Sequence, residues 1–324
     1  MNRTTASLLS RRDVIRAGLV GGAALAVAPP LAISAQPPSQ TSTGGGGAPI
    51  LKAIPSSGEK IPVIGLGTNA YGVTDAAEVA SRKEVLQHMS SLGGRVIDTA
   101  HQYGRSEEVI GELLAALGNR KSYFLATKTP MGEIADAKAA IEESFRRLRT
   151  DHIELLQVHN MNAADKQLPA FRDFKKAGKI RYLGVTTSQD GHYEEMLRVM
   201  RANELDFIQV DYSLGNRSAE EQILPLAQER GVAVIANVPL GGRRGSMMSS
   251  LAGKPLPPWA SEIGATSWAQ LALKYVVSHP AVTCTIPGTT KLKHAEDNQL
   301  AGRGALPDAA MRKKMEQYWD SLPA

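Results

Sequence analysis

The sequence predicts an α/β protein in which parallel strands close into a (β/α)8 TIM barrel as a single domain. Short apolar, β-branched runs alternate with helical patterns, and these units mostly recur about every 30 residues. Many expected helices end at a glycine, the residue that most easily adopts the left-handed C-terminal position. The 324 residues suffice for one such barrel. A doubly wound open sheet is the alternative that the same alternation allows.

The expected strands and helices follow one another in strict order. The strands are expected at 63–67, 96–98, 123–127, 153–158, 182–185, 207–210, 233–236 and 284–286. The clearest helices are expected at 76–90, 106–117, 135–148 and 219–229. In a barrel of this kind, active sites lie at the carboxyl ends of the strands.

The N-terminus has the pattern of an export signal. Arg11 and Arg12 precede a weakly apolar run, AGLVGGAALAVAPPLAISA, that ends in small residues. This pattern resembles a twin-arginine signal peptide over residues 1–35, cleaved after Ala35. It predicts a periplasmic protein, carried there by the twin-arginine translocation machinery. A membrane anchor is the alternative, but the run is short and contains two prolines.

Residues 36–49 are rich in Pro, Ser and Gly and are expected to form a flexible linker before a barrel domain over 50–324. Charge indicates no nucleic-acid partner: the net charge is +5, but four of the 37 basic and one of the 32 acidic residues lie in 1–35, which leaves +2. Cys284 is the only cysteine, which excludes an internal disulfide and a cysteine-based metal cluster. We expect Cys284 to be buried and no metal to be bound. The oligomeric state is not indicated.

Four ionisable residues stand at or just after neighbouring strand ends. Asp98 ends the second expected strand, Tyr103 follows in its loop, Lys128 follows the third strand and His159 the fourth. Each alone has an ordinary structural explanation: a turn cap, a packed ring, a solvated lysine or a rim histidine. Four such residues at one barrel mouth indicate a shared chemical role.

The quartet suits the reduction of a carbonyl group. A tyrosine hydroxyl ordinarily has a pKa near 10, and a neighbouring ammonium favours its ionised form. Lys128, held by Asp98, would supply that ammonium to Tyr103, and His159 would orient a substrate carbonyl. No side chain donates hydride, so a nicotinamide cofactor is implied. The alternatives are a Schiff-base aldolase that uses Lys128 and a cofactor-binding sensor or accessory barrel with little turnover.

The stretch DTAHQYG at 98–104, followed by Ser106, Glu107 and Gly111, resembles the signature of the aldo-keto reductase family. The similarity extends from about residue 50 to 300 and includes IPVIGLGT, TK, IELLQVH and the segment that begins IPGT. The resemblance implies an NAD(P)H-dependent reductase of aldehydes or ketones with Tyr103 as the acid–base. In that scheme Lys128 and Asp98 tune Tyr103, and His159 orients the substrate.

The resemblance also implies where the cofactor binds, with the nicotinamide across the barrel mouth and its carboxamide near Thr186 and Gln209. Two departures concern the nicotinamide: Thr186-Thr187 replaces the usual Ser-Asn pair, and Asn237 occupies the position of the stacking aromatic. The residues expected to bind the cofactor are Gly67, Thr68, Thr186, Gln209, Asn237, Leu240, Gly241, Thr289, Lys291, His294 and Asn298.

The cofactor is expected to be NADP, with NADPH preferred and NADH possible. Gly288 and His294 stand where the family usually has a lysine and an arginine for the 2′-phosphate, and Thr289 and Lys291 could take over this role. Residues 241–264 form a long loop that could cover the cofactor as a lid, with Arg243 or Arg244 near the pyrophosphate. Trp259 is a candidate for a substrate-pocket wall, or else an anchor of this loop.

Overall fold

The structure, a computed structural model, describes residues 47–132, 136–241 and 247–322. The predicted signal peptide, residues 36–46 of the predicted linker, and Arg243 and Arg244 lie outside the described residues.

Eight parallel strands form the central sheet, ordered as they occur along the chain. The two edges of this sheet meet, because Gly65 N donates to Thr285 O at 2.8 Å and Thr285 N donates to Val63 O at 2.9 Å. The sheet is therefore closed, which confirms the (β/α)8 barrel and excludes the open sheet. The strands are β3 (Leu66–Gly67), β4 (Val96–Asp98), β5 (Phe124–Lys128), β6 (Ile153–Val158), β7 (Ile180–Thr186), β8 (Phe207–Asp211), β9 (Ala233–Asn237) and β10 (Val282–Thr285).

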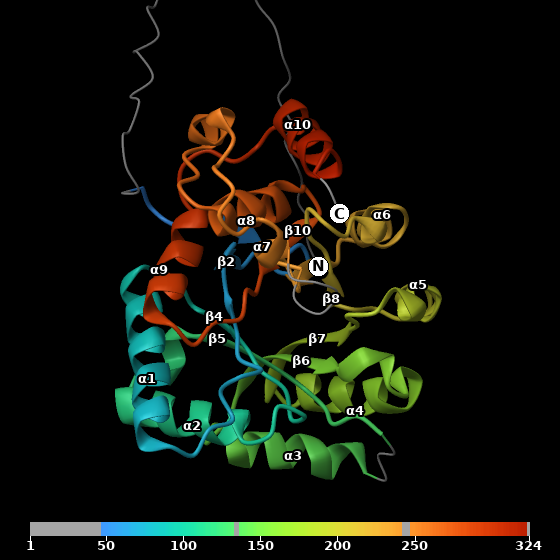
Figure 1. The fold of residues 1–324 in the computed structure, drawn as a ribbon. Helices are drawn as coiled ribbons and strands as arrows, with labels where there is room; N and C mark the ends of the chain where they lie inside the picture. The colour runs from blue at the N-terminus through green and yellow to red at the C-terminus, as the bar shows by residue number, and fades with distance from the viewer. Residues whose placement is uncertain (1–46, 133–135, 242–246, 323–324) are drawn as a thin grey trace, which may run out of the picture. The chain divides into compact units, whose positions relative to one another are not determined.

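The helices lie around the outside of the strands (Figure 1). Short polar side chains begin several of them: Asp75 accepts from Glu78 N at the start of α1, and Asp136 accepts from Lys138 N at the start of α3. Gly118, at φ 62°, ends α2. The helices are α1 (Ala76–Ser91), α2 (Ser106–Leu117), α3 (Ala137–Arg147), α4 (Ala164–Lys176), α5 (Tyr193–Ala202), α6 (Ile223–Glu229), α7 (Met247–Ser250), α8 (Trp268–Ser278), α9 (Leu292–Ala301) and α10 (Ala309–Asp320).

Two expected elements differ in detail from the structure. Only Leu66–Gly67 of the expected strand 63–67 is regular. At Gly65 the chain passes so close to β4 that a Cβ would lie 2.9 Å from the Val96 side chain. The expected helix 219–229 is a 3-10 turn, Ser218–Glu220, followed by α6. Pro225 explains this break, since its ring excludes a helical carbonyl four residues earlier and it has no N–H to donate.

A hairpin that the sequence did not predict closes the amino-terminal end of the barrel. Strands β1 (Leu51–Ala53) and β2 (Lys60–Pro62) pair in antiparallel fashion. Ile54 and Ile61 from this hairpin pack with Phe124 and Phe207, which begin β5 and β8, inside the barrel. The barrel is thus filled by apolar side chains at this end, and space for a ligand remains at the other.

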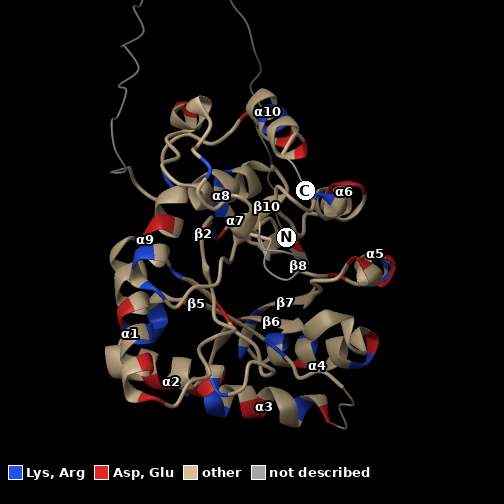
Figure 2. Ribbon diagram, in the orientation of Figure 1, with Lys and Arg blue, Asp and Glu red and all other residues tan. Residues whose placement is uncertain are grey.

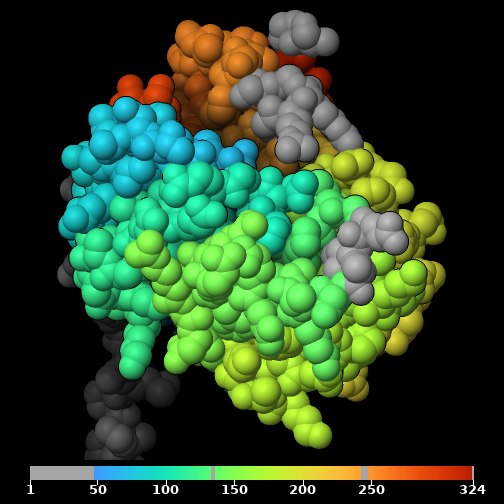
Figure 3. Space-filling model, turned by 90° about the horizontal axis from the view of Figure 1, so that it is seen from below, coloured from blue at the N-terminus to red at the C-terminus, as the bar shows by residue number. Residues whose placement is uncertain are grey.

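Charged residues lie mainly on the outer helices, and few lie on the strands (Figure 2). In the space-filling view from below, the teal-to-green part of the chain, which contains α2, α3 and α4, forms much of the visible surface (Figure 3). Asp98 and Lys128 are exceptions, because each is charged, ends a strand and is 1% exposed. This buried pair of opposite charges marks the candidate active site of the barrel.

Candidate active site

The structure brings the four sequence-predicted residues to one cavity at the carboxyl ends of the strands. Asp98 is the last residue of β4, Lys128 the last of β5, and His159 follows β6 directly. Tyr103 comes from the loop between β4 and α2. All four line a cavity of about 340 Å³ that is open to solvent.

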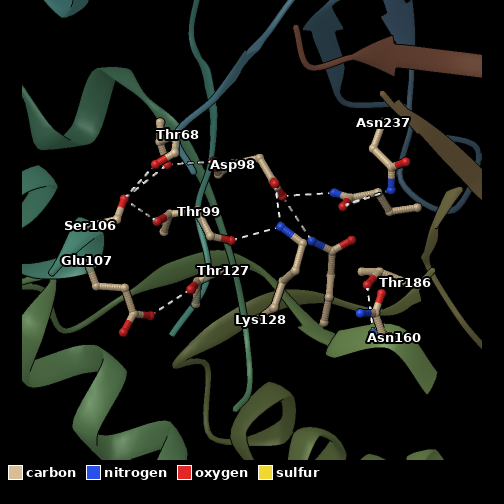
Figure 4. A network of polar contacts seen from close by, with 12 residues as sticks. Thr68, Asp98, Thr99, Ser106, Glu107, Thr127, Lys128, Asn160, Thr186 and Asn237 are labelled. Atoms are coloured by element: carbon tan, nitrogen blue, oxygen red, sulfur yellow. Dashed lines mark hydrogen bonds and ion pairs between the residues drawn. The ribbon is translucent and has the colours of Figure 1, made fainter. Parts of the chain in front are cut away.

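Asp98 holds Lys128 at the base of this cavity. Lys128 Nζ donates to Asp98 Oδ1 and to the Thr99 carbonyl at 2.9 Å, as Figure 4 shows. Asp98 Oδ2 accepts from Gln209 Nε2 at 2.9 Å and from Gln157 Nε2 at 3.3 Å. Both carboxylate oxygens therefore have donors, which a buried carboxylate requires.

Lys128 is an ammonium ion in this setting. Burial alone lowers the pKa of Lys128, but the charges and hydrogen bonds of Asp98 and Tyr103 outweigh burial and raise this pKa above its ordinary value. The ammonium lies 5.2 Å from the centre of the Tyr103 ring. His159 meets the same ring edge-on, with the centroids 5.9 Å apart. A cation and an imidazole thus flank the tyrosine.

A cluster of hydroxyl groups, missed by the sequence reasoning, fixes the loop that carries Tyr103. Ser106 Oγ donates to the Thr68 carbonyl at 2.9 Å and lies 3.0 Å from Thr99 Oγ1, and Thr68 Oγ1 donates to the Asp98 carbonyl at 2.8 Å (Figure 4). Gly72 lets the Tyr103 backbone approach closely, since a Cβ on residue 72 would lie 2.6 Å from the Tyr103 carbonyl oxygen. These contacts join β3, β4 and α2 around the loop.

The predicted cofactor-binding residues divide into two groups. The first lines the same cavity as Tyr103 and consists of Gly67, Thr68, Thr186, Gln209, Asn237 and Leu240. The second lies outside it: Gly241 lines a neighbouring cavity of about 270 Å³, and Thr289, Lys291, His294 and Asn298 lie before and along α9. Lys291 and His294 are exposed at the start of this helix, whereas Asn298 is buried. Their cofactor roles remain predictions.

The positions that depart from the family pattern are tied into hydrogen bonds. Thr186 Oγ1 accepts from Asn160 N at 3.2 Å, while Thr187 Oγ1 donates to the Gln189 carbonyl. Asn237 Nδ2 donates to the Thr187 carbonyl at 3.0 Å and lies 3.4 Å from Gln209 Oε1. Asn237 therefore presents an amide to the cavity where the family usually has an aromatic ring.

The cavity wall also contains residues that are not among the predicted catalytic and cofactor-binding residues. Val238 lies in the left-handed region at φ 50°, which is rare for a β-branched residue and marks a strained turn at the cavity. The only local sequence signal for this turn is Pro239, which follows Val238. The other such residues are Asn69, Asn160, Ser188, Pro239, Ile286, Pro287 and Gly288.

Trp259 does not line the cavity in the described part of the chain. Its ring packs edge-on against Tyr318 of α10 at 5.8 Å, and the ammonium of Lys314 lies 5.4 Å from it. Trp259 is thus an anchor of the long loop, the alternative to a substrate wall. Cys284 is free and fully buried, as expected, and burial followed by the Asp98 charge raises the pKa of its thiol well above the ordinary range.

No group of three or more His, Cys, Asp or Glu side chains in the described residues could hold a metal ion. Within the same ranges, no helix has the length and apolar character that a membrane span needs.

The model of the aldo/keto reductase family matches residues 63–317, most of the chain. The chain belongs to the aldo/keto reductase family. It is therefore an oxidoreductase, and the family expected from the sequence is confirmed. A curated relative, the methylglyoxal reductase YeaE of Escherichia coli, is 32% identical over 274 residues, which cover 82% of this chain and 95% of the relative.

Solved members of the family have the same fold. The structure of an aldo/keto reductase from Klebsiella pneumoniae in complex with NADP and acetate matches with a TM-score of 0.67 and 27% identity, over 81% of this chain and 93% of the other. An aldo-keto reductase from the same organism in complex with NADPH matches with a TM-score of 0.69 and 26% identity, over 83% and 95%.

Proposed function

We propose that the protein reduces the carbonyl group of a small polar aldehyde or ketone, with NADPH as reductant and Tyr103 as proton donor. The observation that carries this proposal is the buried Lys128–Asp98 pair beside the Tyr103 ring, with His159 on the same cavity. This arrangement supplies a proton donor, a fixed positive charge and a second hydrogen-bonding group around one point.

Each of these residues has a definite task in the reduction. The Tyr103 hydroxyl donates its proton to the carbonyl oxygen as that oxygen becomes negative, and the Lys128 ammonium stabilises the tyrosinate that remains. Asp98 keeps the ammonium in place. His159 directs the carbonyl oxygen towards Tyr103. A bound nicotinamide supplies the hydride.

The cavity suits a nicotinamide. Thr186, Gln209 and Asn237 offer polar groups to a carboxamide on one wall, while Leu240 and Ile286 offer apolar surface to a flat ring. Asn237 Oδ1 is buried and accepts no hydrogen bond from the residues that the structure describes. Such an acceptor on a cavity wall suits an amide donor of a ligand. Lys291 and His294 would hold a 2′-phosphate at the start of α9, and similar proteins bind NADP or NADPH.

The wall of the cavity favours small polar substrates. Apart from Tyr103 and His159 it contains no aromatic side chain in the described residues, and Asn69, Asn160 and Ser188 present polar groups. The similar methylglyoxal reductase acts on a compound of this kind. We therefore propose 2-oxoaldehydes as the first substrate class.

The two alternatives lack support from the site. A Schiff-base lysine must be an uncharged amine, whereas the pKa of Lys128 is raised and its nitrogen is committed to Asp98 and the Thr99 carbonyl. A sensor without turnover has no use for a buried ion pair under a tyrosine.

Oxidation of NADPH and NADH with a panel of carbonyls, from methylglyoxal to bulky aromatic aldehydes, tests the function. We expect NADPH to be consumed, and faster with small polar compounds than with bulky ones. Cofactor binding without consumption by any carbonyl would favour the sensor and overturn the proposal.

We further propose that the protein is exported through the twin-arginine route and acts in the periplasm. The support is Arg11-Arg12 ahead of a weakly apolar run and a linker, all of it outside the region that the family model matches. This route carries folded proteins, which suits a domain that must bind a dinucleotide first. Replacing Arg11 and Arg12 by lysine should retain the protein in the cytoplasm, and undiminished export of this variant would refute the proposal.

A further inference from the structure

Gln157 is a buried side chain that satisfies only half of its hydrogen-bonding groups. It lies in β6 and is 0% exposed. Its Nε2 donates to Asp98 Oδ2 at 3.3 Å, but no donor among the described residues reaches its Oε1. A buried carbonyl without a donor destabilises a fold, and an apolar side chain of similar size would avoid that cost. The amide therefore has a use other than packing.

The hydrogen bonds of Asp98 indicate what the Gln157 amide does. Its Oδ1 accepts from Lys128, and its Oδ2 accepts from two neutral amides, Gln157 on β6 and Gln209 on β8. The two amides fix the rotation of the carboxylate about its Cβ–Cγ bond, so that Oδ1 faces Lys128. Gln157 does not line the cavity, and the hydrogen bond that its side chain donates goes to Asp98.

We propose that Gln157 is a positioning residue for the reduction: by donating to Asp98 Oδ2, it fixes the carboxylate that holds Lys128 beside Tyr103. This inference rests on the proposed function, since it assigns Lys128 and Tyr103 their roles. It adds a residue 59 positions from Asp98 along the chain to the acid–base machinery.

The amide also moderates the charge of Asp98. The titratable groups around that carboxylate are Lys128 from β5, Tyr103 from the loop after β4, His159 from the end of β6 and the Cys284 thiol from β10. Each hydrogen bond to the carboxylate draws off part of its negative potential. Without Gln157, that potential acts more strongly on Lys128, and the ammonium holds its proton to higher pH.

Gln157→Met tests the inference. We expect kcat to fall about tenfold, the size of effect that loss of one hydrogen bond to a charged group gives, with both KM values nearly unchanged. The alkaline limb of the kcat–pH profile should move to higher pH. The Tm, measured without cofactor, should stay the same or rise, because the carbonyl without a donor is gone.

Gln270→Met is the matched control. Gln270 is also buried and its Nε2 donates to an aspartate, Asp297 Oδ1, at 2.7 Å, but its Oε1 is satisfied by Thr266. It lies outside the cavity. This variant should lower the Tm and leave the kcat–pH profile in place, the reverse of Gln157→Met.

Gln157→Glu provides a rescue. Its carboxylate faces that of Asp98, and two like charges favour protonation of one of them. The protonated glutamic acid can donate to Asp98 Oδ2 as the amide does. The rate should therefore recover towards that of the unchanged protein as the pH falls, which a packing role does not predict.

Three results would overturn the inference: a kcat–pH profile of Gln157→Met like that of the unchanged protein, a large loss of Tm or failure to fold in this variant, or no recovery of Gln157→Glu at low pH. Tyr103→Phe, measured beside them, separates this inference from the proposed function. If Tyr103→Phe keeps its full rate, the proposed function fails. If it is inactive and Gln157→Met behaves normally, only the role of Gln157 fails.

Discussion

Lys128 and Asp98 form an ion pair between the last residues of β5 and β4, and their side chains are 1% and 2% exposed. Taking both charges out of water opposes folding, and their attraction offsets this only where geometry and further hydrogen bonds are good. The Thr99 carbonyl and the amides of Gln157 and Gln209 provide those hydrogen bonds. The fold thus accommodates a costly ion pair at the cavity where we propose that the carbonyl is reduced.

Asp98→Asn should therefore lower stability more than it lowers activity. The variant leaves the Lys128 ammonium buried without a counter-charge, and breaking a buried pair in this way costs about 3–5 kcal/mol. Lys128 keeps its hydrogen bond to the Thr99 carbonyl, so the loss of kcat should be smaller than in Lys128→Met. Urea unfolding and steady-state rates measure the two effects. An unchanged unfolding free energy would show that the pair is not desolvated as described.

Lys291→Met should weaken the binding of NADPH and leave that of NADH unchanged. Lys291 is exposed immediately before α9, where its ammonium can meet a 2′-phosphate that only NADPH carries. We expect the Kd for NADPH, measured by fluorescence titration, to rise about tenfold. Lys138→Met on α3 is the control, because this lysine is exposed but paired with Asp173 away from the cavity. Equal losses for both cofactors would place the phosphate elsewhere.

His279 should make the protein sensitive to acid. Burial, and after it the charge of Arg312, lowers the pKa of His279 to about 4 from the usual 6.5, with Glu220 opposing and Lys52 adding to this. The folded protein then keeps His279 neutral where the unfolded chain takes up a proton. Stability should therefore be full above about pH 6.5 and fall as the pH drops towards about 4.

His279→Asn tests this directly. The asparagine oxygen can still accept from Ala281 N, as His279 Nδ1 does at 3.2 Å, but it binds no proton. The fall in Tm between about pH 7 and about pH 4.5 should be smaller in the variant than in the unchanged protein. An identical fall in both would mean that other groups govern acid unfolding.

The barrel could be predicted because the same strand–helix pattern repeats along the sequence. The strands are short apolar runs and several helices, α3, α4 and α5 among them, are amphipathic, and both patterns are visible in a window of a few residues. The hairpin at 51–62 was missed because its two strands have three residues each and carry no periodic signal. Their place is set by contacts of Ile54 and Ile61 with strands far along the chain.

The quartet could also be predicted, since strand ends of a barrel share one mouth and DTAHQYG is a distinctive motif. Gln157 could not be selected in this way. It appears in the sequence as one residue of an apolar strand, and its meaning depends on Asp98, 59 residues earlier. Gln209, 111 residues from Asp98, was expected to face the cofactor, and the structure shows that its amide nitrogen serves the carboxylate. Such sequence patterns predict which strand carries a residue, but they do not predict which residue on another strand its side chain will contact.

The most direct test of the account is the rate of hydride transfer in Tyr103→Phe, measured before steady state with a small aldehyde and saturating NADPH. The variant keeps the ring that packs edge-on against His159 and removes only the hydroxyl. We expect transfer to slow by about 100- to 10,000-fold, the usual contribution of a general acid, while the Kd for NADPH stays nearly constant. Transfer as fast as in the unchanged protein would show that Tyr103 is not the proton donor and would contradict the account.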